Sequence, residues 1–130
     1  MTATKANKPS TAKNQGAAAE ALALTYLTEQ GWETVTTNFR STYGEIDLIV
    51  KQAQTLAFVE VKQRKNDRFG SAQAMVTPQK QQKIILTSQY FLQQHRQYQK
   101  FHLRYDVLAI DTHTGSPHIT WLTNAFYAYS

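Results

Sequence analysis

Two stretches of the chain follow the hydrophobic period of an α-helix. Residues 15–30 are rich in alanine and leucine, contain no glycine or proline after Ala17, and are followed by Gly31, a residue typical of helix ends. Residues 79–97 carry their apolar side chains at helical spacing, with Thr77 as a candidate N-cap and Pro78 at the first helical position. The pattern therefore predicts two helices.

Five shorter segments are typical of β-strands, because they alternate apolar with polar residues or are rich in branched and aromatic ones: residues 32–38, 43–50, 55–63, 103–110 and 119–122. The polar stretch 51–54 predicts a four-residue turn. The segment after it is apolar on both faces until Glu60, which predicts a central strand. The order α-β-β-β-α-β-β predicts an α/β domain with helices packed on a mixed sheet.

Composition narrows the class of protein. A chain of 130 residues is the size of one domain. The absence of cysteine excludes zinc fingers, iron–sulfur sites and disulfides. The longest apolar run has five residues, 125–129, and the lysines near the N-terminus have no apolar stretch behind them. We therefore expect a cytoplasmic protein with no membrane partner.

The positive charge is concentrated at the N-terminus. The chain has 14 basic and 9 acidic residues, a net charge of +5. Residues 1–14 contain three lysines and no acid, and they show no hydrophobic period, so we expect a disordered basic tail there. Such a tail is either a solvated terminus or a loose arm for nucleic acid.

Glu20 is the only charged residue between Lys13 and Glu29. Steps of three and four place it on one helical stripe with Ala17, Ala21, Leu24 and Leu27. If this stripe faces the sheet, the carboxylate needs a cation or several hydrogen-bond donors in return for its lost hydration. If a neighbouring face is the buried one, Glu20 is simply hydrated.

A second group of charged residues lies at the end of the predicted central strand. Glu60 and Lys62 lie two residues apart and share one face. With a four-residue turn, Val50 pairs with Thr55, and Asp47 lies diagonal to Glu60 at about 7–8 Å between backbones. Two such carboxylates can share one divalent cation.

Other arrangements of these acids remain open. The same pairing brings Glu45 opposite Glu60, and the spacing does not decide whether Glu45 or Asp47 points into the cluster. Three acids on one patch repel each other, which favours a metal ion. The alternative is a set of surface ion pairs with Arg40, Arg64 or Lys65.

These acidic blocks resemble the PD-(D/E)XK nuclease pattern, and the wider match resembles the YraN-type family of small bacterial proteins, which are similar in fold to archaeal Holliday-junction resolvases. The resemblance covers about residues 15–126. It rests chiefly on Gly44-Glu45-Ile46-Asp47-Leu48-Ile49 and Phe58-Val59-Glu60-Val61-Lys62, supported by Ala19-Glu20-Ala21, Asn38-Phe39-Arg40, Lys80 and Arg104-Tyr105-Asp106-Val107. One departure is Ile46, where the family has a proline before the first acid.

The resemblance implies a restriction-endonuclease-like fold over residues 15–130 and a site for Mg²⁺ or Mn²⁺. Asp47 and Glu60 would bind the ion together with the backbone carbonyl of Val61. Lys62 would orient the attacking water or neutralise charge on the phosphate, and Glu20 would complete the site through water or a second ion.

Further residues are candidates for substrate contacts. Residues 62–68 leave the expected site directly and include Arg64, Lys65 and Arg68, which either contact phosphates or form a solvated loop. Lys80 and Lys83 at the start of the second helix form either an anion site or an ordinary helix surface. The aromatic residues that could stack on bases, or instead belong to the core or to loops, are Tyr43, Phe69 and Tyr105.

The sequence therefore predicts a metal-dependent endonuclease acting on DNA, with branched or structured DNA as the substrate implied by the resemblance. A homodimer would allow two sites to cut two strands. The alternatives are a nucleic-acid-binding module with weak or no catalysis, and an adaptor in a DNA repair or recombination complex.

Overall fold

The structure is a computed structural model that describes residues 11–64, 73–112 and 115–128. The described residues form two α-helices, two short 3₁₀ helices and five strands: α1 (Thr11–Glu29), β1 (Glu33–Arg40), β2 (Glu45–Gln52), β3 (Thr55–Arg64), η2 (Gln73–Met75), α2 (Pro78–Gln94), η3 (Arg96–Tyr98), β4 (His102–Asp111) and β5 (His118–Phe126).

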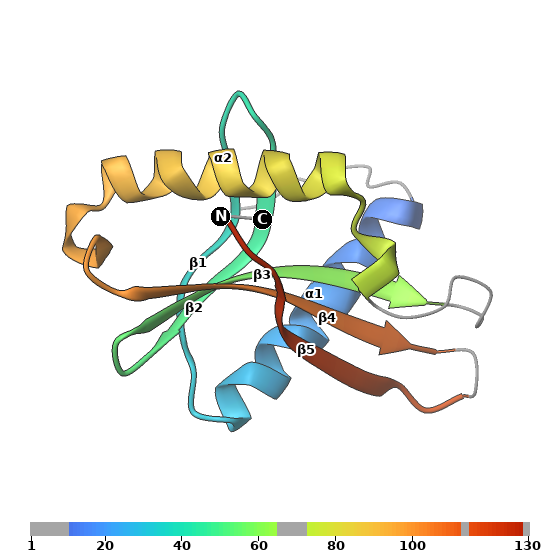
Figure 1. The fold of residues 1–130 in the computed structure, drawn as a ribbon. Helices are drawn as coiled ribbons and strands as arrows, with labels where there is room; N and C mark the ends of the chain where they lie inside the picture. The colour runs from blue at the N-terminus through green and yellow to red at the C-terminus, as the bar shows by residue number, and fades with distance from the viewer. Residues whose placement is uncertain (1–10, 65–72, 113–114, 129–130) are drawn as a thin grey trace, which may run out of the picture.

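The strands form one mixed sheet in the order β1-β2-β3-β4-β5 (Figure 1). β3 and β4 are parallel and are connected through α2, whereas the other neighbouring pairs are antiparallel. A parallel pair requires a crossover connection of this kind. The predicted α-β-β-β-α-β-β order and the mixed sheet are confirmed, and they are consistent with the α/β nuclease-like fold that the resemblance implies.

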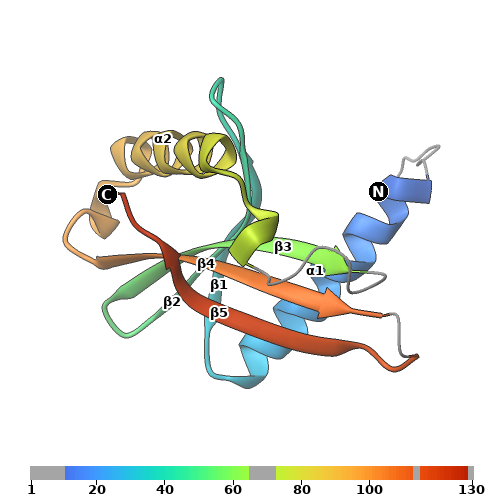
Figure 2. The same ribbon diagram turned by 45° about the vertical axis from the view of Figure 1, so that its right-hand side comes forward.

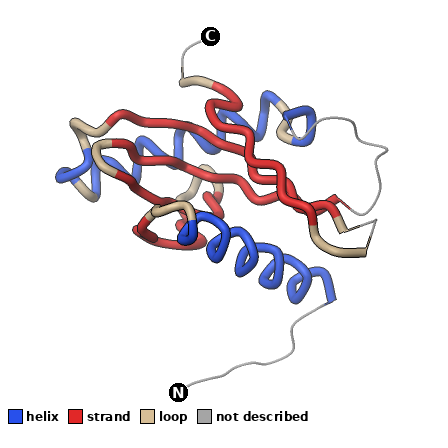
Figure 3. Tube along the Cα trace, turned by 90° about the horizontal axis from the view of Figure 1, so that it is seen from below, coloured by secondary structure: helices blue, strands red, loops and turns tan. Residues whose placement is uncertain are grey.

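The two long helices cover opposite faces of the sheet (Figure 1 and Figure 3). Ala19, Ala23 and Leu27 of α1 belong to one apolar cluster, together with alternate side chains of β2, β3 and β4. Ile84 and Phe91 of α2 belong to the other cluster, on the opposite face. The central strand β3 contributes buried side chains to both clusters, as its continuous apolar run predicts.

Three boundaries differ from the sequence prediction by three residues or more. α1 begins at Thr11, because nothing in residues 11–14 breaks a helix. The expected basic tail over residues 1–14 otherwise lies outside the described residues. α2 ends at Gln94, before the predicted end at residue 97, and a short 3₁₀ helix follows. β5 continues to Phe126, four residues past the predicted end.

The turn between β2 and β3 is shorter than predicted. Gln52 pairs with Thr55, so Ala53 and Gln54 alone form the turn. Ala53 has a φ of 52°, the backbone conformation that tight hairpin turns require. The pairing is therefore shifted by two residues from the expected one, which keeps each side chain on its expected face but changes its neighbour.

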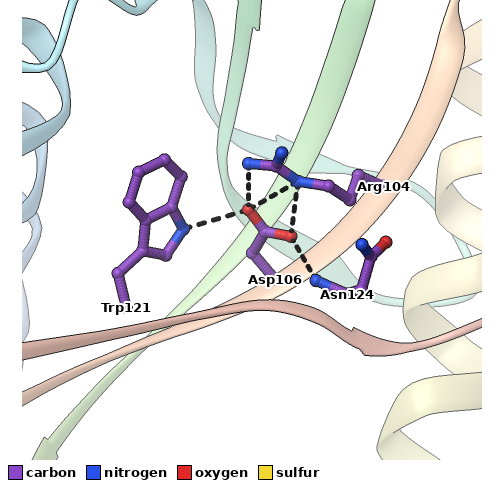
Figure 4. A network of polar contacts seen from close by, with 4 residues as sticks. All are labelled: Arg104, Asp106, Trp121 and Asn124. Atoms are coloured by element: carbon purple, nitrogen blue, oxygen red, sulfur yellow. Dashed lines mark hydrogen bonds and ion pairs between the residues drawn. The ribbon is translucent and has the colours of Figure 1, made fainter.

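A buried polar network joins β4 to β5 (Figure 4). The Asp106 carboxylate is fully buried and accepts hydrogen bonds from the Arg104 guanidinium, the Trp121 indole N–H and the Asn124 backbone N–H. The Arg104 guanidinium lies 4.9 Å from the centre of the Trp32 ring and 5.4 Å from that of Trp121. This network stabilises the irregular pairing near Tyr105 and Val107, where Asn124 has a φ of 54°.

Neither long helix in the described part of the chain has the combination of length and apolar composition that crossing a bilayer requires.

The Asp106 network is expected to be a major source of stability. Asp106→Ala leaves Arg104 in a largely buried position without its carboxylate, and breaking a buried pair in this way costs roughly 3–5 kcal/mol. Urea unfolding measures the loss. The control is Glu33→Ala, which breaks the exposed Glu33–Lys51 pair and should cost less than about 1 kcal/mol. Equal losses in the two variants would contradict the assigned role of the network.

Candidate active site

The candidate site lies where β2 and β3 separate. Their ladder ends at the pair Leu48–Val59, and beyond it β2 pairs only with β1 while β3 pairs only with β4. The Asp47 side chain bridges the two strands there, because its Oδ2 atom accepts a hydrogen bond of 2.8 Å from the backbone N–H of Val61. The N–H and C=O of one strand residue point to the same side. The Val61 carbonyl therefore faces the same gap.

Glu60 is the buried acid of the site, with 5% of its surface exposed. Its Oε2 atom lies 3.1 Å from the Lys80 ammonium nitrogen and 3.8 Å from that of Lys62. Lys62 comes from the same strand, and Lys80 comes from the first turn of α2. Two cations from separate elements thus meet one buried carboxylate.

Burial and mutual repulsion perturb both carboxyl groups. Loss of hydration, followed by the nearby Asp47 charge, raises the pKa of Glu60 to about 7, although Lys80 and Lys62 oppose the rise. Burial also raises the pKa of Asp47, against the lowering effect of the Val61 N–H. Both groups would ionise more readily if a further cation were bound between them.

The Lys80 ammonium is the closest compensating charge. Its half-buried position alone would lower its pKa, but the Glu60 carboxylate at 3.1 Å outweighs this effect, and the net pKa is raised. The start of α2 is fixed by Thr77, whose side chain accepts a hydrogen bond from the Lys80 N–H, as expected of an N-cap. The cap therefore positions the lysine backbone directly.

The structure distinguishes the two candidate acids of β2. With the two-residue turn, the register places Asp47 level with Glu60 instead of diagonal to it. Glu45 lies two residues farther from the turn, at the start of β2. Glu45 pairs with Arg40 at 3.6 Å between exposed side chains, which is the ion-pair alternative. Asp47 is the acid that points towards β3, and the expectation of Glu45 opposite Glu60 is wrong because it assumed the longer turn.

Glu20 lies beside this cluster, on the α1 side. The buried stripe of α1 is Ala19, Ala23 and Leu27, whereas Ala17 and Ala21 are exposed, so of the two alternatives left open by the sequence the neighbouring face is the buried one. The alanine-rich composition leaves the helix without a strong apolar face, which is why the sequence did not decide between them. Glu20 is at the edge of the buried stripe and is partly exposed.

Asn38 of β1 connects Glu20 to the site. Its side-chain amide donates a hydrogen bond of 3.2 Å to the Glu20 carboxylate, and its register on β1 falls at Asp47 of β2. Desolvation raises the pKa of Glu20, the Asn38 hydrogen bond opposes the rise, and the charges of Asp47 and Glu45 add to it. The acids are therefore close enough for their charges to interact.

Sequence reasoning gave no role to Asn38 and did not place Lys80 at Glu60. Asn38 has a φ of 52° within a strand, a conformation that asparagine tolerates better than most residues. An asparagine inside a run of β-formers was therefore an available signal. No local pattern could have paired Lys80 with Glu60, because the contact depends on how α2 crosses the sheet.

The remaining residues that were predicted to contact the substrate do not join this cluster in the described part of the chain. Arg64 forms a two-pronged ion pair with Asp111 of β4, with contacts of 2.7 and 2.9 Å, in a largely buried position. Lys83 is exposed on α2, one turn beyond Lys80. Lys65 and Arg68 lie outside the described residues.

The donor set suits a hard divalent cation. Mg²⁺ and Mn²⁺ prefer carboxylate, carbonyl and water oxygens. Asp47 and Glu60 present two carboxylates whose charged forms lack full compensation, and the Val61 carbonyl faces the same gap. Among the described residues, no group of three or more His, Cys, Asp and Glu side chains is arranged to hold a metal. A cation here would thus be bound by two carboxylates, backbone and water.

Comparison with known proteins gives a consistent family. Residues 19–110 match the model of the uncharacterised protein family UPF0102. A UPF0102 protein of Legionella pneumophila is 43% identical over 116 residues, which cover 89% of this chain and 97% of the relative. One from Vibrio parahaemolyticus is 47% identical over 106 residues, covering 82% and 86% of the two chains. One from Acinetobacter baumannii is 48% identical over 100 residues, covering 77% and 75%.

The raised pKa of Glu60 predicts a pH dependence of stability in metal-free buffer. Between pH 4.5 and about 7 the folded protein keeps a proton that the unfolded chain releases, so the free energy of unfolding should fall as the pH rises through this window. The total is on the order of 3 to 4 kcal/mol, at about 1.4 kcal/mol for each pKa unit. Urea unfolding in EDTA at a series of pH values measures it.

The matched variant for this measurement is Glu60→Gln, which keeps the size of the side chain and cannot ionise. It should lose much of the pH dependence and should be the more stable protein at pH 8. A difference between the two proteins that stays constant from pH 4.5 to 8 would contradict the buried, proton-holding state of Glu60.

Proposed function

We propose that this chain, which belongs to the uncharacterised protein family UPF0102, is a nuclease that hydrolyses phosphodiester bonds in DNA with a divalent cation bound by Asp47 and Glu60. The observation that carries the proposal is the meeting of these two acids with Lys62 and Lys80 where β2 and β3 separate. A purely structural role would not require a buried acid beside a second acid, because an apolar pair would be at least as stable.

The reaction needs a nucleophilic water and compensation for negative charge that grows on the phosphate. A divalent cation, when bound, supplies an activated water at neutral pH and neutralises phosphate charge. The protein groups that would hold the ion are the Asp47 and Glu60 carboxylates and the Val61 carbonyl. The oxygen-only donor set fits Mg²⁺ or Mn²⁺.

The two lysines have different positions and therefore different proposed roles. Lys62 shares the strand face of Glu60 at 3.8 Å and is placed to orient the attacking water or to face the reacting phosphate. Lys80 is the direct counter-ion of Glu60 at 3.1 Å and is 40% exposed. Its ammonium is placed to contact a phosphate oxygen once another cation neutralises Glu60.

The surrounding groups would support this arrangement. Asn38 would hold Glu20 next to the acids, where Glu20 can bind water around the ion or accept a second ion. The net charge of +5 favours a polyanionic substrate. Arg64 is tied to Asp111, so we assign it to the support of β3 and not to substrate binding.

Cleavage assays test the proposal directly. Purified protein is incubated with four-way junction, flap and linear DNA in Mg²⁺ or Mn²⁺. Glu60→Ala and Lys62→Ala should each lower the cleavage rate by about 100-fold or more, the usual effect of removing a group that stabilises the transition state. Lys80→Ala should weaken both DNA binding and cleavage.

The control for the lysine variants is Lys51→Ala, whose side chain pairs with Glu33 on β1, away from the site. It should cleave at the wild-type rate. Cleavage that survives Glu60→Ala would reject the assigned site. DNA binding without cleavage on any substrate would favour a binding module instead.

Metal binding has a readout that does not depend on activity. Mn²⁺ should raise the melting temperature of the wild-type protein, by an amount equivalent to about 2.7 kcal/mol when its concentration is 100 times the dissociation constant. Asp47→Asn should lose most of this stabilisation, and Glu33→Ala should keep it. The same stabilisation in Asp47→Asn and wild type, measured by thermal unfolding with and without Mn²⁺, would contradict the proposed ligands.

A further inference from the structure

The turn between β1 and β2 forms a projection next to the candidate site. It rises past α2 in both side views of the molecule (Figure 1 and Figure 2). Tyr43 is in this turn, two residues before β2 begins at Glu45, and 48% of its surface is exposed. The turn thus exposes the Tyr43 ring just before the strand that contains Asp47.

The three aromatic residues that could stack on bases are distinguished by their exposure where the structure describes them. Tyr105 is buried in the core, where its ring stacks between those of Phe58 and Phe126 at 5.4 and 5.3 Å. Phe69 lies outside the described residues. Of the two that are described, Tyr43 alone is available to a ligand.

The turn is attached firmly to α2. The Ser41 hydroxyl accepts a hydrogen bond from the Tyr43 N–H and forms another with the Thr87 hydroxyl, at 3.0 Å in each case. Gly44 lies so close to the helix that a Cβ atom there would be 3.4 Å from the Cβ of Lys83. The position of the Tyr43 backbone is therefore set before any ligand binds, which reduces the entropy lost on binding.

The surroundings of Tyr43 combine aromatic surface with positive charge. Tyr43, Leu86 and Tyr90 line one shallow hollow together with two glutamines. Tyr90 is itself partly exposed, and its ring packs 6.0 Å from that of Phe39. Lys83 borders the turn, and Lys80, one helical turn away, reaches Glu60. Cations thus follow α2 from the hollow to the candidate site.

From this arrangement we propose that Tyr43 stacks on an unpaired nucleobase of the DNA strand whose phosphate lies at Lys83, on the side of α2 that leads to Lys80. This inference rests on the proposed nuclease function and deepens it by naming the substrate class. In a continuous duplex both faces of every base are covered, so a ring that stacks on a base requires an unpaired or splayed nucleotide. Tyr43 therefore selects flaps and junctions over linear duplex.

Binding in EDTA tests the inference without catalysis. Fluorescence anisotropy compares a flap whose first unpaired base is 2-aminopurine with a linear duplex of the same length. Base–aromatic stacking is worth about 1–3 kcal/mol, so Tyr43→Ala should weaken flap binding by roughly 5- to 150-fold. Its affinity for the duplex should stay within about twofold of wild type, and the 2-aminopurine fluorescence quenched by wild type should recover.

Two further variants make the result specific. Tyr43→Trp keeps a stacking ring and should retain flap binding and quenching. Leu22→Ala removes a side chain of comparable exposure, 40%, from α1 on the opposite face of the sheet, and should change neither. Thermal unfolding checks that each variant is folded.

The outcomes separate this inference from the proposed nuclease function. Unchanged flap affinity in Tyr43→Ala, an equal loss for flap and duplex, or no binding of either DNA at low salt would overturn the stacking role. A flap preference that depends on Tyr43, in a protein that cuts no DNA in Mg²⁺ or Mn²⁺, would support the stacking role and reject the nuclease function.

Discussion

The hydrogen bond from the Val61 N–H to the Asp47 carboxylate determines the geometry of the candidate site. It forms where the β2–β3 ladder has ended, so a side chain replaces the backbone partner that Val61 would otherwise have. The bond holds the Asp47 side chain towards β3, while the two-residue turn sets the register that brings Asp47 level with Glu60.

The charges around this bond come from several parts of the fold, and none of these parts forms a site alone. β2 contributes Asp47, β3 contributes Glu60 and Lys62, and the crossover through α2 contributes Lys80. Glu60 is 5% exposed, so its charged form depends on cations from both β3 and α2. The connection that the parallel β3–β4 pair requires therefore also brings Lys80 to Glu60, because this connection contains α2.

Much of the fold could be predicted from the sequence because helical and strand periods are local. The site was only partly predictable. The spacing of Glu60 and Lys62 on one strand face is local, and it was sufficient to select them as candidates. The neighbour of Asp47 depended on the length of one turn, and the Lys80–Glu60 contact depended on the path of a whole helix. The sequence left open which face of α1 is buried, and so the environment of Glu20, because alanine marks no helix face clearly.

The two halves of β3 have different surroundings. Residues 55–59 lie between β2 and β4, whereas residues 60–64 pair with β4 alone, with Arg64 anchored to Asp111 at the far end. The charged residues of the candidate site thus occupy the half that contributes less to the apolar core. Such a division allows the chemistry of the site to diversify during evolution while the architecture persists, since replacements at Glu60 or Lys62 leave the central packing of the sheet intact.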